Sequence, residues 1–184
     1  MMSNRKAGII FMTLFGTMWA YTGLFGIQGP WPSIMLFMPL IVGAGLLVGG
    51  IFMNKNTLLS TDEGQEVSLT DKKEMKRRFN LVFAAQGLAI AITIAICIAT
   101  QTNEFIPLII ALVVGLHFFP LASIFKMKLY YWTGSLLCLL AAITWLFVPA
   151  SFPLGEYTIT STMTVIGFGS AFILWGSAVS IWKV

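Results

Sequence analysis

Charged residues are scarce in this chain of 184 residues: only 10% are Asp, Glu, Lys or Arg, against about a quarter in a soluble domain. The hydrophobic fraction is 58%, and the mean hydropathy is +0.88. Several apolar runs exceed the ~18 residues that mark a membrane-spanning helix. These runs are continuous, whereas the strands of a membrane barrel alternate at every second residue. The composition therefore excludes a soluble domain and predicts an all-α integral membrane protein.

Asp, Glu, Lys and Arg are absent from the interior of every predicted span, which leaves His117 as the one histidine at membrane depth. Ion-coupled pumps and transporters generally need such groups at membrane depth. Two-carboxylate hydrolysis and carboxylate metal sites have no residues to use, and the usual nucleophile, C-x-x-C and phosphate-loop motifs are missing. The sequence thus offers no catalytic residue, no metal site and no cofactor motif, so an enzyme is the least favoured class.

Cysteine is equally rare, with Cys97 and Cys138 as the only two residues of this type. Their spacing matches no metal or redox motif. Cys97 is expected near the outer end of its span and Cys138 near the middle of another, so the two should not form a disulfide. Both are expected to be free thiols that behave as small apolar side chains.

Six apolar runs are long enough to cross a bilayer. They predict one domain over residues 1–184, a six-transmembrane-helix bundle built from three helical hairpins. The expected spans are about 9–27, 33–53, 79–100, 105–124, 129–148 and 158–182. Pro39 should kink the second span. In the same span Gly45 and Gly49 form a G-x-x-x-G pair, which suits close packing within the chain or in a homodimer. No breaker stands between Asp71 and Thr100, so the third helix should begin before its span.

The positive charges are distributed very unevenly along the chain. All eleven Lys and Arg fall in four places: Arg5 and Lys6, the segment 55–78, Lys126 with Lys128, and Lys183. With six spans, these places share one side of the membrane, and Glu104 and Glu156 lie on the other. The positive-inside rule then predicts that the N and C termini are cytoplasmic, as is the loop 54–78.

Five basic residues at the start of the third helix are expected at the membrane surface, namely Lys72, Lys73, Lys76, Arg77 and Arg78. Their attraction to anionic lipid headgroups is about 1 kcal/mol per residue. Basic clusters also bind nucleic acid, but membrane topology explains this one, so no nucleic acid partner is expected. Docking of a membrane protein partner on this segment stays open.

His117 lies about twelve residues into the fourth span, three residues before Pro120. Pro120 leaves the carbonyl of Leu116 without its helical hydrogen bond. An unpaired polar group in hydrocarbon costs several kcal/mol, so this spot needs a partner. Residues equally far from the outer turn at 101–104 lie at equal depth, which places His117 level with Gln86. We expect the two side chains to form a hydrogen bond or to line one small cavity.

The ligand-binding residues expected on these grounds share membrane depth and either a polar group or a large ring: His117, Gln86, Pro120, Trp145, Trp175 and Tyr21. Ligand pockets combine apolar walls with a few polar groups, which these residues would supply. Two plainer interpretations stay open. His117 could simply tie two helices together, at about 0.6–2 kcal/mol, and the tryptophans could serve in ordinary packing.

The run His117-Phe118-Phe119-Pro120-Leu121-Ala122, then Phe125, then Tyr130-Tyr131-x-Thr133-Gly134, resembles a pattern in small uncharacterised bacterial integral membrane proteins. It covers about twenty residues of the fourth and fifth spans. The resemblance implies a multi-pass protein of the bacterial cell (inner) membrane and attaches no activity to it. In size and number of spans, the chain is also similar to the substrate-binding subunits of energy-coupling-factor vitamin transporters, although a fold analogy does not establish function.

Two functional hypotheses follow. In the first, the protein binds or transports a small neutral or apolar molecule through a pocket near His117. In the second, it is a non-catalytic membrane subunit, regulatory or protective, that acts through helix packing and its basic cytoplasmic loop. A cavity that reaches His117 favours the first hypothesis, and a closed, dry bundle favours the second.

Overall fold

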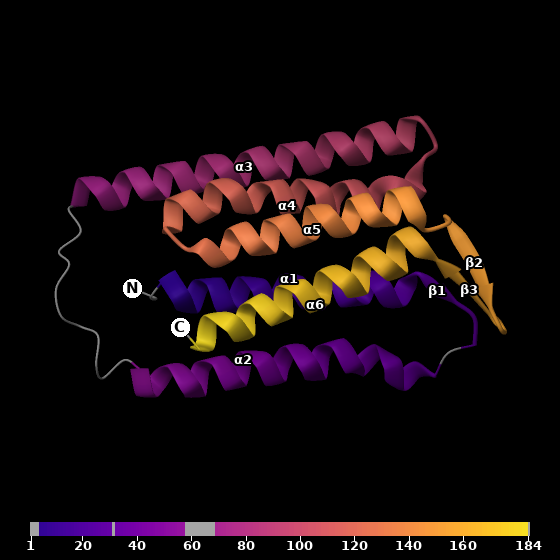
Figure 1. The fold of residues 1–184 in the computed structure, drawn as a ribbon, viewed down its shortest axis with the longest axis horizontal. Helices are drawn as coiled ribbons and strands as arrows, with labels where there is room; N and C mark the ends of the chain where they lie inside the picture. The colour runs from indigo at the N-terminus through magenta and orange to yellow at the C-terminus, as the bar shows by residue number, and fades with distance from the viewer. Residues whose placement is uncertain (1–3, 31, 58–68, 184) are drawn as a thin grey trace.

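The computed structural model describes residues 4–30, 32–57 and 69–183, which form a bundle of long helices (Figure 1). The helices of these ranges are α1 (Asn4–Phe25), α2 (Met38–Thr57), α3 (Leu69–Ala99), α4 (Ile106–Phe125), α5 (Lys128–Phe147) and α6 (Ser161–Lys183), with two short 3-10 helices, η1 (Ser33–Phe37) and η2 (Asn103–Phe105). Six helices are long and apolar enough to cross a membrane. The described chain is therefore a multi-pass helical bundle.

The basic residues of the described chain lie at one end of this bundle. Helix α1 begins and α6 ends at the same end, where α3 also begins and the α4–α5 turn lies (Figure 1). Lys126 caps α4 in that turn, and Lys128 is the first residue of α5. Glu104 in η2 and Glu156 in the turn between two strands lie at the other end. We call these the basic end and the sheet end.

The core is formed by two helix pairs, α1 with α6 and α4 with α5, which make the most extensive contacts. Each pair crosses on glycines. A side chain at Gly167 of α6 would overlap the backbone of Gly23 in α1, and a Cβ at Gly134 of α5 would lie 2.7 Å from the carbonyl oxygen of Gly115 in α4. Small residues at such points let helix backbones approach closely. The three-hairpin description thus follows the chain order but misses the strongest packing.

Helices α2 and α3 lie at the two edges of the bundle (Figure 1), α2 against α1 and α6, and α3 against α4. Their outer faces expose large apolar side chains, among them Leu40, Ile41, Phe52, Leu81, Leu88, Ile92 and Ile96. A water-soluble monomer rarely exposes apolar patches beyond a few hundred Å². Lipid is the natural solvent for these faces, in agreement with the composition.

The Gly45-x-x-x-Gly49 pair does not pack within the chain at its first glycine. A side chain added at Gly45 would meet no atom within 4 Å. Of the two possibilities for this pair, packing within the chain is therefore not found at Gly45 among the described residues, and Gly45 lies on the exposed side of α2.

The sheet end carries a small antiparallel sheet that the apolar pattern does not predict. It consists of β1 (Ile27–Gln28), β2 (Ser151–Leu154) and β3 (Tyr157–Thr160), in the order β1-β3-β2. The pair β2–β3 is a hairpin whose two-residue turn begins at Gly155, with a positive φ of 63°. Residues 157–160 are extended and pair with both other strands. The last helix consequently begins at Ser161 and not at the predicted residue 158.

The second span also differs from its predicted bounds. Residues 33–37 form η1, and α2 starts at Met38, so Pro39 lies in the first helical turn instead of kinking a longer helix. Proline is well tolerated there because its missing N–H would have no helical partner. Helix α2 continues to Thr57, past the predicted start of the loop at residue 54. Residues 58–68 of that loop lie outside the described residues. Helix α3 runs unbroken from Leu69.

Candidate functional site

A cavity of about 630 Å³ lies in the half of the bundle nearer the basic end. Its walls come mainly from α1, α3 and α4, with Tyr130 of α5 and Leu174 of α6 completing them. This volume falls within the ~300–1,000 Å³ that ligand pockets typically occupy. The lining reaches from the first turns of α3 to about the middle of α1 and α4 and includes no residue of the sheet. The cavity therefore extends from one end of the bundle into its interior.

Helices α1 and α3 face each other across this cavity and barely touch each other directly. Phe11 and Phe15 of α1 and Phe79 and Phe83 of α3 line it. Each pair is four residues apart, so both rings project from one side of their helix. Phe11, Phe15 and Phe83 are exposed although they line the cavity, so the cavity is not sealed on this side. The gap between α1 and α3 thus leaves the cavity open sideways, toward the space that lipid would fill.

Helix α4 forms the floor with a single face. Val114, His117, Phe118, Leu121 and Phe125 line the cavity, at the three- and four-residue spacing that places side chains on one side of a helix. The lining side chains of α4 are apolar except for the imidazole. His117 is thus the polar group that α4 presents to the cavity.

The imidazole of His117 is enclosed by aromatic rings and lacks a full set of polar partners. Its ring centroid lies 6.3 Å from that of Phe83 and 6.1 Å from that of Phe118, both edge to face. Its Nδ1 atom is buried and has no hydrogen-bond partner among the described residues. The imidazole interacts with the backbone carbonyl of Val82 in α3, but Nδ1 itself has no partner there. An unpaired buried polar atom costs about 1–3 kcal/mol, which a bound molecule or water can offset.

Gln86 lines the same cavity from α3. The structure therefore brings Gln86 and His117 to one space, as the depth argument predicts, but no hydrogen bond joins the two side chains among the described contacts. Because the two side chains are not bonded to each other, both can form hydrogen bonds to a molecule in the cavity. Together with the hydroxyl of Tyr130, they are the neutral hydrogen-bonding side chains of the lining.

The other four expected ligand-binding residues lie away from the cavity. Pro120 is on the exposed side of α4, beside Leu116, because α4 turns its other face to α3. The hydroxyl of Tyr21 donates a hydrogen bond to the carbonyl of Leu36 (2.9 Å) and so ties α1 to η1. These two residues have structural positions.

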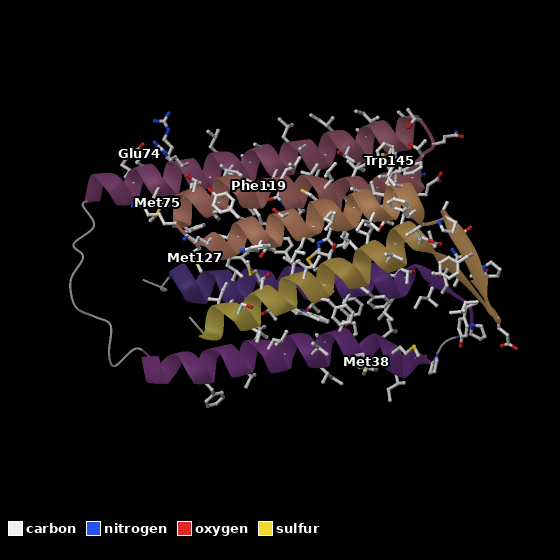
Figure 2. The ribbon with its side chains drawn as sticks, in the orientation of Figure 1. Met38, Glu74, Met75, Phe119, Met127 and Trp145 are labelled. Atoms are coloured by element: carbon white, nitrogen blue, oxygen red, sulfur yellow. The ribbon has the colours of Figure 1, made fainter. Side chains whose placement is uncertain are left out.

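Both expected tryptophan walls are also wrong. Trp145 is 67% exposed and lies toward the sheet end, far from Met75 at the mouth of the cavity (Figure 2). Trp175 packs over Gly16 of α1, where a Cβ would lie 2.6 Å from its ring. The walls are phenylalanines instead. Phe79, Phe83 and Gln86, at helical spacing on α3, are the sequence signal that could have identified them.

Two of the five basic surface residues belong to the cavity. Lys73 and Lys76 line its mouth at the start of α3, next to Met75, at the basic end of the bundle (Figure 2). Glu74 is engaged elsewhere, since its carboxylate accepts hydrogen bonds from Nη2 (2.7 Å) and Nε (3.1 Å) of Arg78. Arg77 is exposed. Lys72 lies in the first turn of α3, and its side chain is outside the described part of the structure.

The two cysteines are free, Cys97 buried and Cys138 half-buried. The sulfur of Cys138 lies at the α4–α5 crossing, where a Cβ on Gly115 would come within 2.7 Å of it. Among the described residues, no three His, Cys, Asp or Glu side chains gather as a metal site would require. The chemistry available at the cavity is thus apolar contact, neutral hydrogen bonding and two cations at the mouth.

Comparison of the chain with protein-family models, with curated proteins and with solved structures finds no match.

Proposed function

We propose that this protein binds a small neutral or apolar molecule in the cavity between α1, α3 and α4. The observation that carries the proposal is the unpartnered Nδ1 of His117 in an aromatic-walled cavity that it shares with Gln86. Apolar walls with a few polar groups are the common composition of ligand sites. The lining stops near mid-depth. This arrangement favours binding of a molecule over its transport straight through the bundle.

The setting that we propose is the inner membrane of a bacterium, with both termini in the cytoplasm. The sorting of Lys and Arg to one end of the bundle supports this orientation, and the resemblance of the His117–Ala122 run supports the bacterial origin. A single cysteine at Glu156, in a chain without Cys97 and Cys138, should react with an impermeant maleimide in intact cells. Reaction only after lysis would reverse the orientation.

The binding proposal can be tested by photolabelling in proteoliposomes. The probe is hexadecanol with a diazirine in its chain, which joins one hydrogen-bonding group to an apolar tail. We expect it to label Phe11, Phe83 and their neighbours in the cavity several-fold more than Leu40 and Ile41 of α2, which report contact with bulk lipid. Unlabelled hexadecanol should compete at the cavity only. Labelling of the cavity no stronger than that of α2 would contradict the proposal.

Variants sharpen this test. Replacing His117 and Gln86 together by leucine should lower cavity labelling by about three- to tenfold, since each lost hydrogen bond is worth roughly 0.5–1.5 kcal/mol. The matched controls are Trp145→Leu and Tyr21→Phe, which change residues away from the cavity and should leave cavity labelling as it is.

The second candidate function is a non-catalytic subunit that docks another membrane protein. One observation favours it, the exposed face of α2 around Gly45, where no atom of the described chain comes within 4 Å of an added side chain. If α2 docks a partner helix there, Gly45→Leu should abolish co-purification of that partner. Unchanged behaviour of Gly45→Leu in native membranes would dismiss this candidate.

A further inference from the structure

The mouth of the cavity carries charge, and the interior does not. Lys73 and Lys76 are three residues apart on α3, so both project from the side of the helix that lines the cavity. Among the described residues, neither lysine forms an ion pair. The nearest carboxylate along the helix is that of Glu74, and it is bound to Arg78. Within the described part of the chain, the mouth thus presents two ammonium groups without an ion-pair partner above an apolar interior.

The depth of the cavity fits one extended hydrocarbon chain. Gln86 lies ten residues beyond Lys76 along α3, which at 1.5 Å each is about 15 Å. In a bilayer, one acyl chain fills half of the ~30 Å hydrocarbon core, about 15 Å. A chain anchored at the lysines therefore reaches the level of Gln86 and His117.

The volume of the cavity suits a ligand with one chain. About 630 Å³ lies within the ~300–1,000 Å³ of pockets that enclose small ligands. A hexadecanoate ion, with about 18 heavy atoms, is of that size, whereas a two-chain phospholipid has more than twice that number. The lateral opening between α1 and α3 gives such a chain a route from the adjacent leaflet without crossing water.

We infer that the occupant of the cavity is a single-chain amphiphile with an acidic head group. Its head lies between Lys73 and Lys76, and its chain runs between the phenylalanines of α1, α3 and α4. This inference rests on the proposed function, because it identifies the class of molecule that the same cavity binds. It adds that the acidic end is recognised by charge at the mouth.

The test compares three diazirine probes of equal chain length in proteoliposomes: hexadecanoate, hexadecanol and hexadecylamine. Labelling of Leu40 and Ile41 on α2 corrects each probe for its concentration in the bilayer. We expect the carboxylate to label the cavity about three- to tenfold more than the alcohol, the range that two partly exposed charge pairs provide, and the amine to label it least. The preference should shrink at high salt because exposed charges are screened.

Two double variants separate site recognition from general surface charge. Lys73→Gln with Lys76→Gln should reduce labelling by hexadecanoate to the level of hexadecanol in the same variant. Lys126→Gln with Lys128→Gln removes two charges from the same end of the bundle but outside the cavity lining, and it should keep the preference.

Each outcome decides a different claim. Equal labelling by carboxylate and alcohol, or loss of the preference in the Lys126/Lys128 control, overturns the acidic-head inference and leaves the binding proposal standing. If neither hexadecanoate nor hexadecanol labels the cavity above the α2 background, the acidic-head inference and the binding proposal are both overturned.

Discussion

His117 combines two properties that a purely structural residue would not need. Its ring is packed edge to face against Phe83 and Phe118, which fixes its position, while its Nδ1 has no hydrogen-bond partner in the described chain. Interhelical polar pairs in membranes stabilise by about 0.6–2 kcal/mol when they form. Here Gln86 shares the cavity but does not form that pair, and the imidazole meets α3 at the backbone of Val82 and the ring of Phe83.

His117→Leu should therefore leave the stability of the empty protein unchanged or raise it by up to about 2 kcal/mol, because leucine removes an unpaired polar atom. Thermal unfolding of the detergent-purified protein measures this. Thr133→Val is the matched control, since the Thr133 hydroxyl is 2.7 Å from that of Ser177 and its loss should cost about 0.6–1.7 kcal/mol. If His117→Leu is destabilised as much as Thr133→Val, the imidazole has a structural partner and our account of it is wrong.

The histidine and tryptophan side chains show which aspects of residue position can be predicted from the sequence. Depth arguments bring His117 and Gln86 to one level because they need only the helical rise. They fail for Trp145, which is exposed and lies toward the sheet end (Figure 2), and for Trp175, which packs against α1. In a bilayer, apolar side chains are equally at home inside the bundle and outside it, so hydrophobic periodicity does not reveal which face of α5 or α6 is buried.

At the scale of elements, the bundle depends on where helices cross. The α1–α6 pair meets at Gly23 and Gly167, with no room for a side chain on Gly167. The α4–α5 pair meets at Gly115 and Gly134 in the same way. Helix α3 packs mainly on α4, and the cavity lies on the side of α3 that faces α1.

Gly167→Ala should consequently destabilise the protein by about 1–3 kcal/mol, the usual cost of forcing extra atoms into a packed core. Gly87→Ala provides the comparison, because Gly87 has no atom within 4 Å of an added side chain and alanine favours helix more than glycine does. Unfolding in graded denaturing detergent would rank the variants. Equal stability of the two would show that α1 and α6 do not cross at Gly167.

The small sheet shows why hydropathy alone does not predict a short element. Gly155 begins a two-residue turn between β2 and β3, a common hairpin arrangement, and Pro153 sits on the edge strand β2, where proline is tolerated. That much is readable from residues 151–160. The third strand is not, because Ile27 pairs with Ile159 across almost the whole chain length, and no local pattern indicates a contact so distant in sequence.

At the scale of the whole molecule, charge and hydropathy predict most of the architecture. Six apolar runs give the six helices, and the segregation of basic residues predicts which helix ends share one end of the bundle (Figure 1). The cavity could not be predicted from the runs, since it depends on α1 and α3 failing to meet. That separation is a property of the packed bundle, and it supplies both the space and the lateral opening on which the proposed function rests.

A density map of the purified protein in lipid nanodiscs, at a resolution that shows side chains, tests the central claim most directly. Our account predicts that α1 and α3 stay apart, with elongated density running from Lys73 and Lys76 to His117 between the phenylalanine rings. Contact of Phe11 or Phe15 with Phe79 or Phe83 across a closed, dry interface would contradict it.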